Sequence, residues 1–433
     1  MAILMSLGAV AVIGCAYLAA IGFKGRVTTV GVDLGTSFSV VGISKGGKIQ
    51  IVTDKFGHDI FPSIVSFQDE GKLFRLYDAM EYLSSDPENT IYNSKRFIGR
   101  NADADDGELK EYAATHPFAV EFVKSSEYSD VGFRIRSTGY ENVSSLSIID
   151  GKPLLSPEYV GTEVLRGLMS LTADFIGHNQ VNKAIVAVPA KFTPEQRVAT
   201  AEAYKKAGLK VVRMIEEPTA AAIAYDLHKD SSVHHIIVYD FGGGTLDVSL
   251  LYVAKGSVQV YATDGDESLG GSDYDICTEK LVQSKLHADS GVDTTDTDTG
   301  SASAVEVHFS CDPNDSTKLA EAVKKALSDN STVEVVCTTG GARAGVAPAR
   351  VTRAEFESAC GELFERAMVP VDRLLTDLGM SPADIDEVVL VGGTTRIPYV
   401  KQRLKTFFGA TTNINDSIDP DITVAFGAAS IID

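Results

Sequence analysis

Two distant stretches of this chain repeat one pattern of residues. TVGVDLGTSFSVVGI at residues 29–43 and IIVYDFGGGTLDVSLLYV at residues 236–253 each contain an apolar strand that ends in Asp, then an intervening apolar residue, a Gly–Thr turn and a second strand. Such a repeat predicts two β-hairpins whose tips consist almost entirely of small residues. A third Gly-rich turn, in EVVLVGGTTRIP at residues 387–398, follows another strand of buried type. Three turns of this kind in one chain indicate a shared ligand.

The segments between the first two turns predict alternating strands and helices. Thr193 and Gln196 form the ends of a capping box with Pro194 at the first helical position, and Gly208 closes the helix. Ser156 and the proline after it open a second helix that extends to about Ile176, and a third is expected from Thr219. The strands KAIVAVP and VVRMIEEP flank the Thr193 helix, which gives a βαβ-like order. The sequence therefore predicts an α/β fold.

Composition limits the classes of function. A chain of 433 residues with 44% hydrophobic residues predicts two or more lobes. Its formal net charge of −20 argues against a nucleic-acid partner, because such proteins concentrate Lys and Arg. The five cysteines show no CxxC pair and no zinc spacing, so we expect scattered thiols and no disulfide framework. The Asp-, Ser-, Thr- and Gly-rich stretch at residues 289–304 is expected to be a mobile surface insertion, and it lacks the EF-hand spacing.

The first 23 residues carry no charged side chain and are followed by Lys24 and Arg26. This pattern predicts a signal peptide or a membrane anchor, and the residues do not decide between the two. Four N-x-S/T sequons permit a lumenal location; they begin at Asn142, Asn314, Asn330 and Asn415.

The Gly-rich turns suit phosphate binding. Glycines at a turn let backbone N–H groups converge on phosphate oxygens, and Ser or Thr hydroxyls add donors. Gly35, Thr36 and Ser37 fit this task, as do Gly242, Gly243, Gly244 and Thr245. A carboxylate beside a polyphosphate needs a cation between them, so Asp33 and Asp240 indicate Mg²⁺. The chain contains neither a G-x-x-x-x-G-K-[ST] loop nor a dinucleotide-binding fingerprint.

Nearly the whole chain after residue 28 resembles the nucleotide-binding domain of the seventy-kilodalton heat-shock family. The motifs that carry the resemblance occur in family order: VGVDLGTSFSVVG, NTIYNSKRFIGR, AIVAVPAKF, IEEPTAAAIAYDL, VYDFGGGTLDVSLL, LGGSDYD, EVVLVGGTTRIP and SIDPDITVAFGAA. Within the family, the chain is most similar to the microsomal stress-seventy ATPase cores. The resemblance implies an actin-like ATPase fold of two lobes with duplicated βββαβα cores around a nucleotide cleft. The lobes are expected at residues 28–216 and 217–433. No peptide-binding domain is expected in this chain, which would be either a free-standing ATPase or a fragment.

The resemblance also implies roles for individual residues. Asp33, Glu217 and Asp240 would hold Mg²⁺ through its water shell, Lys95 would position the attacking water, and Thr36 and Thr245 would contact the γ-phosphate. At the adenosine end, the resemblance implies contacts from Gly392, Gly393, Thr394, Arg396 and Asp421, and from the helix that carries Glu321, Lys324, Lys325 and Ser328. Gly271 is a further implied nucleotide-binding residue. The family usually has Arg where Lys325 stands, and only Arg can stack a planar guanidinium on adenine.

The function implied is slow, Mg²⁺-dependent hydrolysis of ATP, with ATP or ADP as the ligand and K⁺ as an allowed second ion. Co-chaperones or nucleotide-exchange factors are the implied partners, the protein is expected to be a monomer, and contact with a membrane is expected only through residues 1–23. The implied location is the endoplasmic reticulum, lumenal or membrane-anchored. Two alternatives stay open: a non-catalytic nucleotide-dependent sensor or scaffold, and a small-molecule kinase of the same superfamily.

Overall fold

The computed structural model describes residues 26–101, 107–124, 129–140, 146–149, 152–288, 305–310, 316–339, 342–343 and 348–432. The expected leader at residues 1–23 and the expected insertion at residues 289–304 lie outside the described residues. Contacts divide the chain into two units: unit 1 takes the chain up to Ala224 and from Val424 onward, and unit 2 comprises Tyr225–Thr423. This division differs from the expected boundary between residues 216 and 217, because the helix that begins at Glu217 and the segment from Val424 pack with unit 1.

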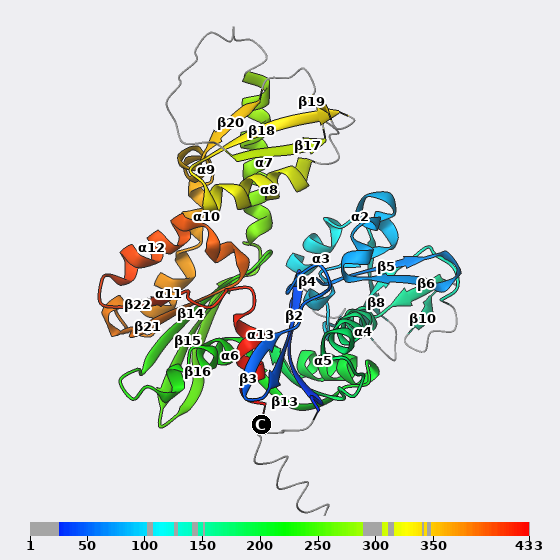
Figure 1. Cartoon of the computed structure of the whole chain (residues 1–433), viewed down its shortest axis with the longest axis horizontal. Coiled ribbons are helices and arrows are strands. Elements are labelled where there is room, and N and C mark those ends of the chain that lie inside the picture. The colour runs from blue at the N-terminus through cyan, green and yellow to red at the C-terminus, as the bar shows by residue number, and fades with distance from the viewer. Residues whose placement is uncertain are drawn as a thin grey trace, which may run out of the picture. The chain divides into compact units, whose positions relative to one another are not determined.

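Unit 1 is built on one mixed sheet with the strand order β13-β12-β1-β2-β3 (Figure 1). β1 pairs antiparallel with β2 and parallel with β12, and β12 pairs parallel with β13. The bounds of these strands are β1 Thr29–Leu34, β2 Phe38–Lys45, β3 Lys48–Ile51, β12 Lys183–Val188 and β13 Lys210–Glu216, and β4 (Phe61–Pro62) pairs with the start of β2.

Unit 2 repeats this plan with the strand order β16-β15-β14-β21-β22. β14, β15 and β16 are antiparallel neighbours, and β14, β21 and β22 run parallel. Their bounds are β14 His235–Phe241, β15 Leu246–Ala254, β16 Ser257–Asp266, β21 Glu387–Val391 and β22 Asn413–Asn415. The expected α/β class and the expected duplication of the core are confirmed, because both sheets contain three antiparallel strands followed by parallel ones in equivalent positions.

Two helices of unit 1 begin where their capping residues predict, and the helix expected from Thr219 begins two residues earlier, at Glu217. α4 (Pro157–Ile176) has Ser156 as its N-cap, and the Ser156 side chain accepts a hydrogen bond from the backbone N–H of Tyr159. α5 (Pro194–Lys206) begins with the predicted capping box between Thr193 and Gln196. The other α-helices of this unit are α2 (Tyr82–Ser85), α3 (Gly107–Ala114) and α6 (Glu217–Ala224), and α13 (Thr423–Ser430) returns to it at Val424.

α13 approaches the backbone of unit 1 closely because glycines provide the room. A Cβ on Gly31 of β1 would overlap the backbone N of Ala429, and a Cβ on Gly42 of β2 would lie 2.8 Å from the Ala425 carbonyl oxygen. A Cβ on Gly427 would overlap the Ala220 carbonyl oxygen of α6. The helix therefore sits directly on β1, β2 and α6, and any larger residue at these glycines would push it away.

Two smaller sheets complete the description of unit 1, and a third lies in unit 2. In unit 1, β5 pairs with β6 and β7, and β8, β9, β11 and β10 form a sheet in that order. Their bounds are β5 Ile64–Gln68, β6 Lys72–Arg75, β7 Thr90–Tyr92, β8 Ala119–Lys124, β9 Ser129–Arg134, β10 Leu146–Ile149 and β11 Lys152–Leu155. The sheet in unit 2 contains β17 (Val305–Ser310), β18 (Thr332–Thr339), β19 (Ala342–Arg343) and β20 (Ala349–Thr352).

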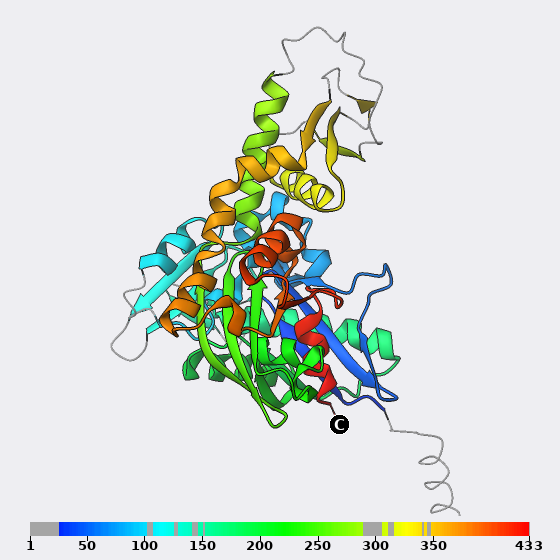
Figure 2. The ribbon, with the colours of Figure 1, turned by 90° about the vertical axis from the view of Figure 1, so that its left-hand side faces the viewer.

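The small sheet of unit 2 is connected to the rest of that unit by helices. α8 packs on β17 and β18, and α7 packs on α8 and β20 (Figures 1 and 2). The chain reaches this sheet through α7 and leaves it through α9 and α10. The helix bounds in unit 2 are α7 Gly271–Ala288, α8 Ser316–Asp329, α9 Arg353–Ala359, α10 Gly361–Arg366, α11 Val369–Asp377 and α12 Pro398–Phe408.

A disulfide joins the two connections of this small sheet. Cys277 of α7 and Cys360, between α9 and α10, are bonded with their Cα atoms 5.9 Å apart and 83 positions apart in sequence. Cys360 is buried, with 1% of its surface exposed. The expectation of scattered thiols was therefore wrong for this pair, because a bond between cysteines so distant in sequence leaves no spacing pattern.

Each unit has its own hydrophobic core. In unit 1 the core includes Phe61, Phe67, Phe97 and Phe133, and in unit 2 it includes Tyr239, Phe241, Tyr274, Phe356 and Phe364, all with fully or almost fully buried side chains. None of the described helices combines the length and apolar character needed to cross a bilayer.

Candidate functional site

Ser63 fixes the tip of the β1–β2 hairpin in unit 1 through two hydrogen bonds. The Ser63 hydroxyl donates a hydrogen bond to the Gly35 carbonyl oxygen at 2.8 Å, and the Ser63 backbone N–H donates to the Ser37 carbonyl oxygen at 2.8 Å. A Cβ on Gly35 would overlap the Phe38 carbonyl oxygen, so the turn needs glycine at this position. Asp33, at the end of β1, and Thr36, within the tip, are half-buried. The predicted phosphate-binding turn is therefore a short, tightly fixed loop.

Lys95 and Glu217 form a close ion pair within unit 1. Lys95 lies in a 3₁₀ turn (Ser94–Arg96) and Glu217 is the first residue of α6, and the Lys95 Nζ atom donates to Glu217 Oε1 at 2.7 Å. Each side chain is only 13% exposed. The neighbouring Glu216 accepts instead from Arg197, at 3.2 Å. The structure thus brings together two of the predicted catalytic residues, which are 122 positions apart in sequence.

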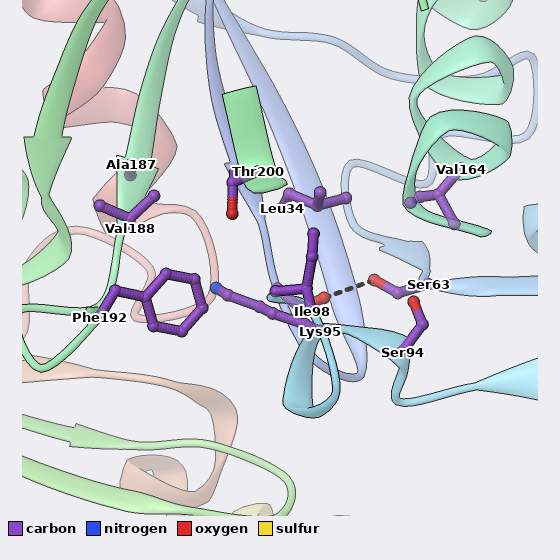
Figure 3. Close-up of a pocket in the computed structure, with 12 residues that line it drawn as sticks. Leu34, Ser63, Ser94, Lys95, Ile98, Val164, Ala187, Val188, Phe192 and Thr200 are labelled. Atoms are coloured by element: carbon purple, nitrogen blue, oxygen red, sulfur yellow. Dashed lines mark hydrogen bonds between the residues drawn. The ribbon is translucent and has the colours of Figure 1, made fainter. Parts of the chain in front are cut away.

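A small pocket lies beside this ion pair (Figure 3). In Figure 3 the Lys95 side chain extends across the pocket toward Phe192, and its Nζ atom is 6.0 Å from the centre of the Phe192 ring. The pocket adjoins the end of β1 and the end of β12. Its lining comprises Leu34, Gly35, Ser63, Ser94, Lys95, Ile98, Gly161, Val164, Ala187, Val188, Phe192 and Thr200. Mostly apolar walls around one cationic group can hold that cation in a fixed position.

The sequence did not point to Tyr204, whose hydroxyl is affected by the carboxylates of Asp33 and Glu217. Tyr204 lies on α5 and is fully buried, and its hydroxyl has no hydrogen-bond partner among the described residues. Burial raises the pKa of Tyr204 well above its ordinary value, and the negative charges of Asp33 and Glu217 raise it further. Only burial and neighbouring charge identify this residue, and neither is visible in the sequence.

The tip of the β14–β15 hairpin in unit 2 is fixed by the start of α7. Within the hairpin, Asp240 and Asp247 are paired residues, and the Gly242 N–H donates to the Thr245 carbonyl oxygen at 3.0 Å. The N–H groups of Gly271 and Ser272 donate to the carbonyl oxygens of Gly242 at 3.0 Å and Gly243 at 2.9 Å. The Gly242–Thr245 turn and the predicted Gly271 are thus neighbours.

The third Gly-rich turn joins this group. The Thr394 hydroxyl donates to the Gly242 carbonyl oxygen at 2.8 Å. A Cβ on Gly392 would lie 3.0 Å from Asp240 Oδ1, and a Cβ on Gly393 would lie 2.9 Å from Asp421 Oδ1. The two Gly-rich turns of unit 2 are therefore in contact, and the ligand that the sequence predicts for them stays a prediction.

The late acidic partner of this turn is bound by arginine. Arg396 donates to Asp421 Oδ2 at 2.9 Å and also pairs with Asp419. Burial raises the pKa of Asp421 above its ordinary value, and the guanidinium of Arg396 opposes this rise. Arg396 and Asp421 therefore contact each other, and the Arg396 side chain is 47% exposed.

Lys324 and Lys325, neighbours on α8, have different environments. The Lys324 side chain is 11% exposed: its Nζ atom donates to the Gly271 carbonyl oxygen at 2.8 Å and lies 2.7 Å from Asp275 Oδ1. Lys325 is 67% exposed and pairs with Glu321 of the same helix at 2.7 Å. The Ser328 hydroxyl donates back to the Lys324 carbonyl oxygen at 3.2 Å. Lys324 therefore connects α8 to the start of α7, and Lys325 is the side chain that can reach a ligand in solvent.

The metal prediction joins residues of both units, because Asp33 and Glu217 belong to unit 1 and Asp240 belongs to unit 2. Within the described parts of the chain, no group of three or more His, Cys, Asp or Glu residues is close enough to hold a metal ion directly. Two carboxylates with the orphaned Tyr204 hydroxyl nearby fit an ion that keeps its water shell, as Mg²⁺ does. The shared metal site itself stays a prediction.

Comparison with known proteins places these motifs in a family. The family model described as "Hsp70 protein" matches residues 29–433. The chain is 35% identical over 408 residues to a chaperone protein DnaK of Prochlorococcus marinus, which covers 92% of this chain and 58% of that protein. It is 36% identical over 408 residues to a chaperone protein dnaK of Cyanidioschyzon merolae, which covers 92% of this chain and 60% of that protein. The chain thus spans less than two thirds of the length of these relatives.

Proposed function

The chain belongs to the Hsp70 family, and from this premise we propose that it binds ATP with Mg²⁺ and hydrolyses it slowly to ADP and phosphate. The observation that carries the proposal is the ion pair of Lys95 and Glu217, 2.7 Å apart and each only 13% exposed, beside the glycine tip that follows β1. The proposal concerns this ATPase domain alone.

The residues of unit 1 have distinct parts in the proposed reaction. Bound Mg²⁺ would neutralise charge on the phosphates. Asp33 and Glu217 hold negative charge where the hydrated ion is required, and the Gly35–Thr36 turn offers backbone N–H groups and a hydroxyl to the phosphate oxygens. Glu217 holds the Lys95 ammonium in place, so that this cation can orient a water and stabilise the charge that develops on the phosphoryl group.

Unit 2 supplies the proposed second half of the site. The Gly242–Thr245 turn would contact the phosphates, with Asp240 on the metal side. The turn that contains Gly393 and Arg396 would lie at the adenosine end with Lys325. Gly271 and Thr394 both donate hydrogen bonds to the Gly242 carbonyl oxygen. These bonds hold the groups of unit 2 in fixed positions and so support the proposal.

Single-turnover hydrolysis of ATP tests the proposal. Lys95→Ala should lower the hydrolysis rate by about 100-fold, which is the usual effect of removing one positioned catalytic group. ADP affinity, measured separately by calorimetry, should change much less. Lys205→Ala is the matched control, because Lys205 is 74% exposed and pairs only with Glu202 of its own helix. Equal rates for the unmodified protein and Lys95→Ala would refute the enzyme and leave the nucleotide-dependent sensor or scaffold.

We also propose a location in the endoplasmic reticulum and membership of the microsomal stress-seventy group. The Cys277–Cys360 disulfide supports an oxidising compartment, because glutathione and thioredoxin keep cytosolic thiols reduced. Two of the four sequons are in described segments, and both of their asparagine side chains already donate hydrogen bonds within the fold. Asn330 donates to the Ala326 carbonyl oxygen, and Asn415 donates to the Glu387 carboxylate and to the Val388 carbonyl oxygen. We therefore expect glycosylation, if it occurs, at Asn142 or Asn314.

Alkylation of free thiols during cell lysis, followed by mass spectrometry, tests the location. Recovery of Cys277 and Cys360 as a disulfide from freshly lysed cells agrees with the proposal, and recovery of both as alkylated thiols contradicts it. Sensitivity to a glycosidase would add support through Asn142 or Asn314.

A further inference from the structure

Tyr204 is a buried polar residue of unit 1 whose hydroxyl finds no hydrogen-bond partner in the described part of the chain. The side chain has 0% of its surface exposed. Folded proteins rarely bury a hydroxyl in this way, because it gives up its hydrogen bonds to water without compensation. A bound group that reaches this hydroxyl would remove the penalty.

The position of Tyr204 on α5 shows which bound group is within reach. Tyr204 follows Thr200 by one turn on the same face of the helix, and Thr200 lines the pocket that contains Lys95. Long side chains on a helix lean toward its N-terminus. β12 ends at Val188 and α5 begins at Pro194, and Ala187 of β12 pairs with Asp33 of β1. This tendency directs the Tyr204 ring toward the N-terminal end of α5, which is the end connected to β12.

The electrostatic surroundings agree with this direction. The charges of Asp33 and Glu217 both act on the Tyr204 hydroxyl. A phenol hydroxyl can accept a hydrogen bond from one group and donate to another. The waters that surround a bound Mg²⁺ are strong donors, and carboxylates only accept, so a hydroxyl beside both can hydrogen-bond to either.

We infer that Tyr204 is a positioning residue for the metal side of the nucleotide site, and that its hydroxyl hydrogen-bonds to an ordered water of the hydrated Mg²⁺ that Asp33 and Glu217 help to hold. The inference rests on the proposed function and adds to it. It makes α5 part of the metal site, although no residue of that helix was selected from the sequence for binding metal. Binding of Mg²⁺ with nucleotide would then satisfy a group that the folded chain leaves unsatisfied.

Removal of one oxygen atom tests the inference. Tyr204→Phe keeps the ring that fills the core, so the variant should be at least as stable as the unmodified protein without nucleotide. Its affinity for ADP in the presence of Mg²⁺, measured by calorimetry, should fall about three- to tenfold, as expected for one lost hydrogen bond. Its affinity for ADP in the presence of EDTA should not change.

Tyr274→Phe is the matched control. Tyr274, in unit 2, is also fully buried with an orphaned hydroxyl, but it packs against Phe364 in an apolar core, with 4.9 Å between the ring centres. Its removal should leave both affinities unchanged. This control separates an effect of the metal site from a general effect of deleting a buried hydroxyl.

The outcomes separate the inference from the proposed function. If the unmodified protein does not bind Mg²⁺ with ADP, the proposed function fails and the inference fails with it. If it binds and Tyr204→Phe retains the full Mg²⁺-dependent affinity, the inference alone is overturned. A crystal structure of the unmodified protein with Mg²⁺ and ADP gives a second reading: an ordered water within about 3.2 Å of the Tyr204 hydroxyl supports the inference, and a dry hydroxyl overturns it.

Discussion

Reduction of the Cys277–Cys360 disulfide should loosen the small sheet of unit 2. The bond closes a loop across 83 sequence positions, and this loop contains α8 and the strands β17, β18 and β20. The chain-entropy relation for such a loop gives a stabilisation of about 4.5 kcal/mol, and measured values for disulfides are typically about 2–4 kcal/mol. We therefore expect unit 2 to lose about 2–4 kcal/mol of unfolding free energy when the bond is opened.

The bond can be opened in two independent ways. A dithiol reductant converts the disulfide to two thiols and is itself oxidised to a disulfide, and the double variant Cys277→Ala, Cys360→Ala never forms the bond. The chain contains no Trp, so unfolding in denaturant is best followed by circular dichroism. Hydrogen exchange with mass spectrometry then localises the change, which should appear as faster exchange in peptides from α8 and β18.

The double variant also provides the control for the reductant. Addition of the dithiol to this variant should change nothing, which separates loss of the cross-link from other effects of the reagent. If the reduced and oxidised proteins unfold at the same denaturant concentration and exchange at the same rates, the loop-closure reasoning is refuted.

Two further predictions follow from individual side chains. Lys325→Arg should raise ADP affinity about two- to fivefold, because Lys325 is 67% exposed and an arginine there can stack on adenine. Calorimetry should show no gain in affinity for tripolyphosphate, which lacks the base. Burial lowers the pKa of the His116 imidazole, so the folded protein resists its protonation and unfolding free energy should be lost as the pH falls below about 6.5. His116→Gln should lose less stability than the unmodified protein between about pH 7.5 and 5.5 in denaturant titrations, and an equal loss in the two proteins would contradict the prediction.

Features with local signals could be predicted from the sequence. The starts of α4 and α5 follow from Ser156 and from the Thr193 capping box, because hydrogen bonds within one helical turn determine them. The two hairpins follow from alternation of strand and turn residues, since the interacting strands are adjacent in the chain. The resemblance to a family added the identities of Lys95 and Glu217.

Features that depend on distant contacts could not be predicted. The motifs named Lys95 and Glu217 without showing that they touch across 122 positions. They gave Lys324 a place at the ligand without showing that its Nζ atom contacts Asp275 and the Gly271 carbonyl oxygen. Tyr204 resembles any other tyrosine of an amphipathic helix until its burial is known. In each case three-dimensional packing determines the environment of the side chain, and local sequence does not record it.

The close approach of α13 to Gly31 and Gly42 has a consequence for synthesis of the protein. Unit 2 is one continuous segment, Tyr225–Thr423, so it can fold as soon as that segment has left the ribosome. Unit 1 is interrupted in sequence, and the face of β1 and β2 that receives Ala425 and Ala429 stays uncovered until those residues have been translated. Unit 1, most of which is translated before unit 2, can therefore complete its fold only after all of unit 2 has been translated.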